Sequence, residues 1–222
     1  MNERMAATIR LLDRVNAAHP WSHNAAFTPF VLRHARAVRR GGGTRALDIG
    51  CGTGALLRRL AGILDEVVGV EPDPATAARA RRAVADQPRA TVIESAFRPA
   101  EFGDETFDLV TLVAVLHHLP LAGTLEAVRP LLRPGGRLVV VGLARETRSD
   151  VLRSAVSALL TPVIGLIRHP RRASAPPEGM LAPTSESRET FDEIAAVARG
   201  ILPGVRMRKR LFWRYTAVWI SD

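Results

Sequence analysis

The stretch ALDIGCGTGALLRRLA, residues 46–61, joins a short apolar run to a glycine-rich turn and then to a helical pattern. The glycines at 50, 52 and 54 allow positive φ and a close approach of the backbone to a ligand. A buried strand that leads through such a turn into a helix is typical of α/β sheets, where the turn usually receives a phosphate. Asp48 stands immediately before the turn, and its carboxylate would repel a phosphate. The stretch predicts an α/β fold and leaves its ligand open.

Short apolar runs alternate with helical patterns through the middle of the chain. Strands are expected at 44–50, 66–71, 90–95, 107–115 and 136–143, with helices at 54–64, 74–86 and 121–132. Because these strands are apolar on both faces, helices are expected on both sides of a parallel sheet. The alternation predicts an open, doubly wound α/β sheet. After a last helix at 189–202, the tail 205–220 suits two strands that pair antiparallel at the sheet edge.

Two flanking regions depart from this alternation. We expect residues 1–40 to form a helical N-terminal lid, and residues 41–222 to form one domain with a substrate-lid insertion at about 145–187. The insertion begins with the apolar run 151–167, which is shorter than a membrane span and contains Arg153, Pro162 and Gly165. We therefore expect no transmembrane segment. The run is interpreted as a helix that either covers a hydrophobic site or rests on a membrane surface.

The formal net charge of +9 is compatible with nucleic acid or an anionic membrane as a partner. Lys209 is the only lysine, and the arginines are scattered through an alanine-rich chain, which favours an ordinary solvated surface and no nucleic-acid partner. The single cysteine, Cys51, excludes a disulfide framework and a multi-cysteine metal site, so no metal is expected. With no continuous apolar run near the N-terminus, the chain is expected to be cytoplasmic.

Two acidic residues favour a cationic cofactor. Glu71 ends the second expected strand, 21 residues after Gly50, where a carboxylate accepts hydrogen bonds from ribose hydroxyls. The glycine spacing alone leaves NAD(P) open. Asp48 instead suits S-adenosylmethionine, whose ammonium and sulfonium groups are cationic, although a role in capping local backbone amides is the simpler alternative.

Four segments together resemble class I S-adenosylmethionine-dependent methyltransferases of the small-molecule type. LDIGCGTG and VGVEPDP are similar to the first two motifs of the family, and FDLVTLVAVLHHLP and LLRPGGRLVVVGL to its fourth- and fifth-strand segments. They occur in order over residues 44–143. The resemblance implies a Rossmann-like, seven-stranded, mostly parallel sheet with an antiparallel C-terminal edge strand.

The resemblance also implies roles for single positions. Asp48 would lie near the cofactor ammonium group, and Glu71 would hold the ribose. The other implied cofactor contacts are Gly50, Cys51, Gly52 and Gly54 at the methionine moiety, Pro72, Ala96 and Phe97 at the adenine, and Val113 through its backbone. Many relatives carry an acidic residue after the third strand, whereas this chain has Ser95 there, preceded by Glu94.

Methyl transfer to a hydroxyl needs a group that removes a proton, and histidines are the candidates. His117 and His118 follow the fourth expected strand, near the expected acceptor position, and are the predicted catalytic residues. A structural or cofactor-side role for one of them is the alternative. His19, Trp21 and His23 are predicted to bind substrate as part of the lid, with a packed N-terminal segment as the alternative.

The sequence thus predicts a bacterial enzyme that transfers a methyl group from S-adenosylmethionine to oxygen or nitrogen of a small, apolar or aromatic molecule, in a setting such as specialised metabolism. Methylation of a lipid or quinone at a membrane surface is an alternative, as is methylation of RNA or protein. The (Asp/Asn)-Pro-Pro-(Tyr/Phe) motif of base and amide N-methyltransferases is missing from VAVLHHLP, which disfavours the second alternative. A scaffold protein without catalysis is disfavoured by the intact glycine motif with its two carboxylates.

Overall fold

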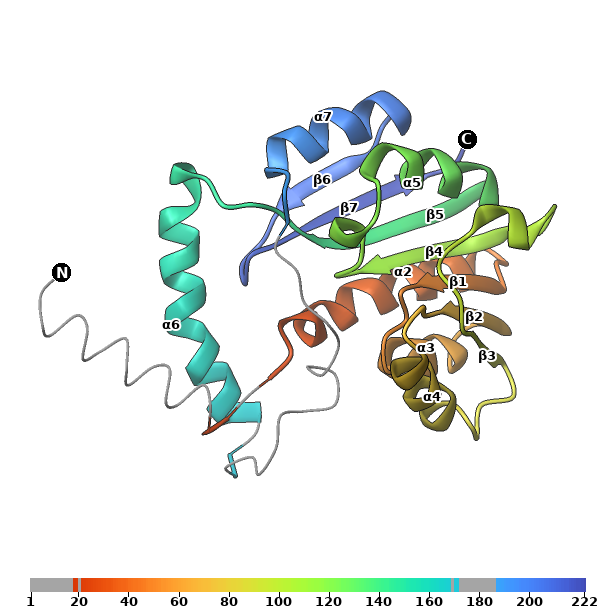
Figure 1. Cartoon of the computed structure of the whole chain (residues 1–222), viewed down its shortest axis with the longest axis horizontal. Coiled ribbons are helices and arrows are strands. Elements are labelled where there is room, and N and C mark those ends of the chain that lie inside the picture. Colours follow the sequence, from red (N-terminus) through yellow and green to blue (C-terminus); the bar gives the residue numbers. More distant parts are fainter. Residues whose placement is uncertain (1–17, 20, 169, 172–186) are drawn as a thin grey trace, which may run out of the picture.

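The computed structural model describes residues 18–19, 21–168, 170–171 and 187–222. Seven strands form one sheet in the order β3-β2-β1-β4-β5-β7-β6 (Figure 1). The strands are β1 (Arg45–Ile49), β2 (Glu66–Val70), β3 (Ala90–Ile93), β4 (Phe107–Val113), β5 (Leu132–Leu143), β6 (Arg206–Lys209) and β7 (Arg214–Ile220). The first five pair in parallel, and β7 pairs antiparallel with both β5 and β6.

The expected seven-stranded, mostly parallel α/β sheet with an antiparallel C-terminal strand is confirmed. One detail differs, because β7 lies between β5 and β6, so β6 occupies the edge of the sheet. The sequence RMRK of β6 alternates exposed and half-buried positions, whereas β7 is mostly buried. A strand buried on both faces belongs inside a sheet, and a short, charged strand belongs at its edge.

Helices cover both faces of the sheet, as Figure 1 shows. The longer helices are α2 (Thr28–Arg40), α3 (Ala55–Ala61), α4 (Pro74–Ala83), α5 (Leu121–Val128), α6 (Val151–Arg168) and α7 (Phe191–Ile201). Buried side chains of α5 and α7 share a core with Leu47, Val110 and Val140, whereas those of α2, α3 and α4 share a second core with Ala46 and Val139. Neighbouring residues of one strand therefore face opposite layers, as the two-residue period of a strand requires.

Local signals fix where the helices begin. Asp73 caps α4 by accepting a hydrogen bond from the Thr76 N–H at 2.8 Å, and Pro74 occupies the first helical position. Thr190 and Glu193 form a reciprocal capping box at the start of α7. Both helices run close to their expected limits.

The two flanking regions are described in part. Residues 1–17, which begin the expected N-terminal lid, and residues 172–186 of the expected insertion lie outside the described residues. Within the first region, the 3-10 helix η1 (His23–Phe27) leads into α2, whose Val31, Leu32, Ala35 and Val38 belong to the core. Within the insertion, the 3-10 helix η5 (Arg148–Asp150) leads into α6, which lies to one side of the sheet in Figure 1.

The strand order places the candidate site. From β1 the chain adds β2 and β3 on one side, and β4 and β5 on the other, so the order reverses between β1 and β4. Ligands of open α/β sheets bind beyond the carboxyl ends of the strands at this reversal. The segments that follow β1, β2 and β4 meet there.

Candidate active site

A cavity of about 610 Å³ opens at the carboxyl ends of β1, β2 and β4. The predicted cofactor residues that line it are Asp48, Gly50, Cys51, Gly52, Glu71, Pro72, Ala96, Phe97 and Val113. Of the predicted catalytic residues, His118 lines it. Further lining comes from residues that the sequence did not single out, among them Ser22, Asn24, Thr28, Val31 and Leu119. The cavity is of the size that small-molecule sites usually have.

Gly50 lets the loop after β1 turn tightly beneath the cavity. The N–H groups of Gly50 and Cys51 both donate to the carbonyl oxygen of Val70 on β2, at 2.8 and 3.0 Å. Gly50 has a φ of 69°, and a Cβ there would lie 2.2 Å from a methyl group of Val115. A side chain is therefore excluded at residue 50 by both backbone and packing.

Gly54 packs between two helices, and its predicted cofactor contact stays a prediction. It is not among the residues that line the cavity in the described part of the chain. Its φ is 81°, and a Cβ would lie 3.0 Å from the Cα of Ala80 on α4. Gly54 therefore allows α3 to begin close against α4, and the sequence could not distinguish this packing role from cofactor contact.

Glu71 is buried at the end of β2 and binds the glycine loop. Its Oε2 accepts a hydrogen bond from the Gly52 N–H at 3.0 Å, and its Oε1 accepts one from the Asp73 N–H at 3.1 Å. Each carboxylate oxygen can accept more than one hydrogen bond. The carboxylate is thus held in a fixed position with lone pairs remaining for ligand hydroxyl groups.

Asp48 is 1% exposed, and its Oδ1 accepts a 2.6 Å hydrogen bond from the Thr111 hydroxyl on β4. Burial raises the pKa of Asp48 to about 7, opposed by the Thr111 hydrogen bond and supported by repulsion from Glu71. Two buried carboxylates beside one cavity are stabilised by a bound cation. This donor set fits a cationic ligand that also carries hydroxyl groups, as S-adenosylmethionine does.

Cys51 does not supply a nucleophile to this site. It is buried, and burial raises the pKa of its thiol, with further increases from Asp48 and Glu71. The reactive thiolate form is therefore suppressed at neutral pH.

The two predicted catalytic histidines have different surroundings in the 3-10 helix η3 (Leu116–His118). Their ring centroids lie 4.0 Å apart, but His118 lines the cavity whereas His117 is not among its lining residues in the described chain. Burial lowers the pKa of His117 to about 4, with contributions from His118 and Arg214. The buried Nδ1 of His117 has no hydrogen-bond partner among the described residues. His117 is neutral at pH 7, and His118 is the better placed candidate base.

Ala114 sets the direction of the chain between β4 and these histidines. It has a φ of 56°, unusual for a residue with a side chain, and its N–H donates to the carbonyl oxygen of Val141 at 2.7 Å. Backbone in this strained region often marks a functional site. Here it bends the chain across the cavity that Ala114 itself lines.

The three predicted substrate residues of the N-terminal segment do not line the cavity in the described part of the chain. Trp21 and His23 pack with Phe212 and Trp213 in an aromatic cluster, with ring centroids 5.0 to 5.5 Å apart. His19 is 8% exposed, and burial lowers the pKa of His23 to about 4. The neighbouring Ser22 and Asn24 face the cavity instead. This geometry fits a packed N-terminal segment, and substrate binding by His19, Trp21 and His23 stays a prediction.

Arg214 is a buried cation that the sequence analysis did not single out. Its Nε and Nη2 donate to Oδ1 of Asn24 at 3.0 and 2.9 Å, and its Nη1 donates to the Phe212 carbonyl oxygen at 3.2 Å. Burial lowers its pKa to about 10. Within the described residues it forms no ion pair, so its charge acts on His117 and His23. In the sequence, the position of Arg214 between aromatic residues, in the stretch FWRYT, was the available indication that this arginine is buried.

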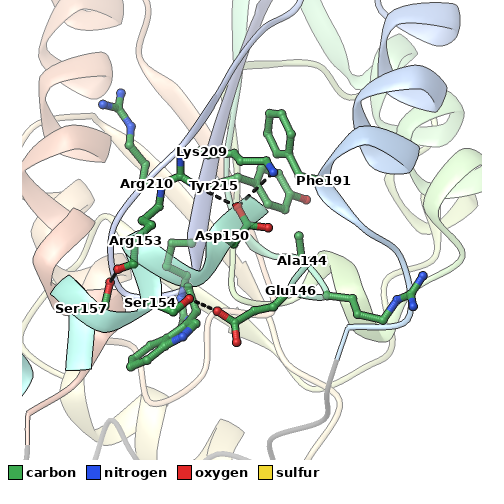
Figure 2. A pocket seen from close by; sticks show the side chains of 13 residues that line it. Ala144, Glu146, Asp150, Arg153, Ser154, Ser157, Phe191, Lys209, Arg210 and Tyr215 are labelled. Carbon is green, nitrogen blue, oxygen red and sulfur yellow. Dashed lines mark hydrogen bonds and ion pairs between the residues drawn. The ribbon is translucent and has the colours of Figure 1, made fainter. Parts of the chain in front are cut away.

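Arg214 also lines a second, much smaller cavity of about 40 Å³, which Figure 2 shows from close by. Asp150 is at its centre and binds Lys209 at 3.0 Å and Arg153 at 2.6 Å. Although burial alone would raise its pKa, hydrogen bonds from Thr147 and Lys209 hold the pKa of Asp150 at about 2. These ion pairs join the start of α6 to β6, so the cluster has a structural explanation.

Comparisons with known proteins agree with this geometry. Residues 47–140 match a family model described as a methyltransferase domain. An uncharacterized methyltransferase of Mycobacterium tuberculosis is 29% identical over 178 residues, which are 78% of this chain and 85% of that protein. A ubiquinone biosynthesis O-methyltransferase of Burkholderia ambifaria is 36% identical over 145 residues, 58% of this chain and 60% of that protein. The N-methyltransferase NodS from Bradyrhizobium japonicum, solved with S-adenosyl-L-homocysteine, superposes with a TM-score of 0.57 at 17% identity, covering 97% of this chain and 98% of that one.

Proposed function

This chain belongs to the class I S-adenosylmethionine-dependent methyltransferases, and we propose that it methylates an oxygen or nitrogen of a small, mainly apolar molecule. The single observation that supports this acceptor is the extent of the cavity. It continues from the cofactor loops to a wall formed by Ser22, Asn24, Thr28, Val31 and Leu119. This wall combines aliphatic side chains with hydroxyl and amide groups, which suits an apolar body that carries a polar substituent.

An oxygen acceptor has additional support. The matched ubiquinone biosynthesis enzymes carry O-methyltransferase in their names, and one is 36% identical over 145 residues of this chain. The likeness to the N-methyltransferase NodS, at 17% identity, concerns the fold alone. We therefore propose a hydroxyl group, such as that of a phenol, as the favoured acceptor.

Each polar residue has a proposed role in the transfer. S-adenosylmethionine, when bound, supplies an electrophilic methyl group on sulfur. Asp48 and Glu71 hold and orient the donor, while Val31 and Leu119 offer the acceptor an apolar surface. His118 would accept the proton of the acceptor hydroxyl during the transfer. Half-buried His117 positions the ring of His118, since the two ring centroids lie 4.0 Å apart.

A panel of acceptors tests the proposal. Purified protein with S-adenosylmethionine would be incubated with simple phenols, catechols, aliphatic alcohols, amines and short RNA, and S-adenosylhomocysteine production measured. We expect turnover with hydroxylated aromatic compounds above the rate without acceptor. Turnover confined to RNA or amines would overturn the proposal. Binding of S-adenosylmethionine by calorimetry serves as the control that the protein is active.

A further inference from the structure

The large apolar side chains of helix α6 face outward, whereas a helix that packs on a protein core turns its apolar face inward. Its buried residues are Ser157, Thr161, Pro162 and Gly165, which are small or polar. Eight of the ten exposed large hydrophobic residues in the described chain lie on its outer face, namely Val151, Leu152, Val156, Leu159, Leu160, Val163, Leu166 and Ile167. A surface helix normally buries its apolar stripe against the core. So large a contiguous apolar surface indicates an interaction site.

The inner face of α6 is fixed by specific contacts. The Trp21 indole N–H donates to the Thr161 carbonyl oxygen at 2.8 Å, and the Phe212 backbone N–H donates to the Ser157 hydroxyl at 2.8 Å. A Cβ on Gly165 would lie 2.3 Å from a backbone carbonyl oxygen of the N-terminal segment. Rotating the helix to bury its aliphatic side chains would break these contacts. The apolar face therefore points outward as a stable feature of the fold.

Basic residues stand at both ends of this surface. Arg148 precedes α6, while Arg168 and Arg171 follow its last apolar turn, and all three are exposed. They form no ion pair within the described residues, although Arg168 also lies over the Trp21 ring at 5.4 Å. The nearby carboxylate of Asp150 is matched by Arg153 and Lys209. The surface thus combines aliphatic side chains with three arginines that form no ion pair in the described part of the chain, beside one carboxylate, Glu146, that accepts a hydrogen bond from Ser154.

We propose that α6 is an interfacial anchor that lies in the surface of an anionic lipid bilayer. Its aliphatic side chains enter the boundary between headgroups and acyl chains, and the arginines at its ends contact acidic headgroups. By length and composition, Arg148–Arg168, which contains an 18-residue window with a mean hydropathy of 1.6, also qualifies as a membrane-crossing helix. The contacts of its inner face favour an orientation parallel to the membrane. The proposal does not depend on the identity of the methyl acceptor.

Charge favours a bilayer over a second copy of the chain as the occupant of this face. Each copy carries a formal net charge of +9. Two α6 faces in contact would bring the terminal arginines of both copies close together, whichever way the helices ran. Acidic headgroups offer the complementary charge.

Vesicle co-sedimentation of the full chain tests the anchor. We expect binding to vesicles of phosphatidylcholine with about one third phosphatidylglycerol, and much weaker binding to phosphatidylcholine alone, because the surface charge adds to the apolar contact. The variant Leu159→Ser/Leu166→Ser should bind at least about tenfold more weakly, since two aliphatic side chains leave the acyl boundary. Ile93→Ser/Ile220→Ser, which alters exposed aliphatic residues on β3 and β7, is the matched control and should bind like the unmodified chain.

Folding of each variant and the oligomeric state of the chain are measured alongside vesicle binding. Unchanged S-adenosylmethionine affinity and circular dichroism show that each variant is folded. Equal vesicle binding by the α6 variant and the unmodified chain would overturn the proposal. Failure of the unmodified chain to bind either type of vesicle would also overturn it. If that chain is a dimer and the α6 variant is a monomer, a second copy of the chain is the occupant of this face. If both are monomers, neither a bilayer nor a second copy covers it.

Discussion

The Thr111 hydroxyl on β4 donates a 2.6 Å hydrogen bond to Oδ1 of Asp48 on β1, across the point where the strand order reverses. Among the described residues, this hydroxyl is the one hydrogen-bond partner of the Asp48 side chain, which is 1% exposed and lies beside a second buried carboxylate, Glu71. One neutral hydrogen bond compensates only part of the loss of water around a charge. The free protein therefore holds Asp48 ready for a cation.

We expect the affinity for S-adenosylmethionine to rise with pH. Burial raises the pKa of Asp48 to about 7, so a proton must leave this group when a cation binds beside it. Between pH 6 and pH 8 the affinity should increase about tenfold, following the ionised fraction of Asp48. Calorimetry in buffers of different ionisation enthalpy measures the released proton. Asp48→Asn should bind more weakly and with a flat pH profile, and a flat profile in the unmodified protein would contradict this role.

Asp48 should also make the cofactor-free protein less stable as the pH rises. Its native pKa of about 7 exceeds the ordinary value of 3.8, so between these values the native state keeps a proton that the unfolded state has lost. The contribution of Asp48 to the free energy of unfolding therefore falls from pH 4 to pH 7. The fall is about 4 kcal/mol, at about 1.4 kcal/mol per pKa unit.

Urea denaturation at pH 5 and pH 7.5 checks this expectation. Asp48→Asn lacks the titration, so its stability relative to the unmodified protein should increase between the two pH values. Comparing the two proteins cancels the contributions of the other carboxylates. A constant difference between them would show that Asp48 has an ordinary pKa in the native state.

Replacing Glu71 should weaken donor binding more than it changes turnover at saturation. Glu71→Ala removes the acceptor of the Gly52 and Asp73 N–H groups as well as the proposed ribose contact. We expect a loss of affinity of about 100-fold, as for a charged hydrogen-bonded group. Glu71→Gln keeps one acceptor oxygen and should lose less. Calorimetry with S-adenosylhomocysteine separates binding from catalysis.

His118 and His117 should give different kinetic results. His118→Ala removes the proposed base at the cavity and should lower kcat for a hydroxyl acceptor about 100-fold or more, with donor affinity unchanged. His117→Gln should have a smaller effect on kcat, because His117 is neutral and does not line the cavity. Equal loss of donor affinity in both variants would show that the pair acts on the cofactor side.

The sequence predicts the sheet well because its information is local. The apolar strands, the glycine loop and caps such as Asp73 depend on residues close together in the chain. It could not separate His117 from His118, since a single 3-10 turn decides which ring faces the cavity. Nor could it give the orientation of α6, because an apolar helix is normally expected to face the core. The position of Arg214 depends on Asn24, far away in the sequence.

That last contact has a consequence for the order in which the molecule forms. The glycine loop, Glu71 and the histidines all lie within about the first half of the chain. The wall around Asn24 is complete only when Arg214, 190 residues later in the sequence, forms its hydrogen bonds with Asn24. Contacts of such sequence separation form late, since long loops must close first. During synthesis, the donor half of the site can therefore fold while the C-terminal strands are still in the ribosome. The proposed acceptor wall is therefore the last part of the cavity to be completed.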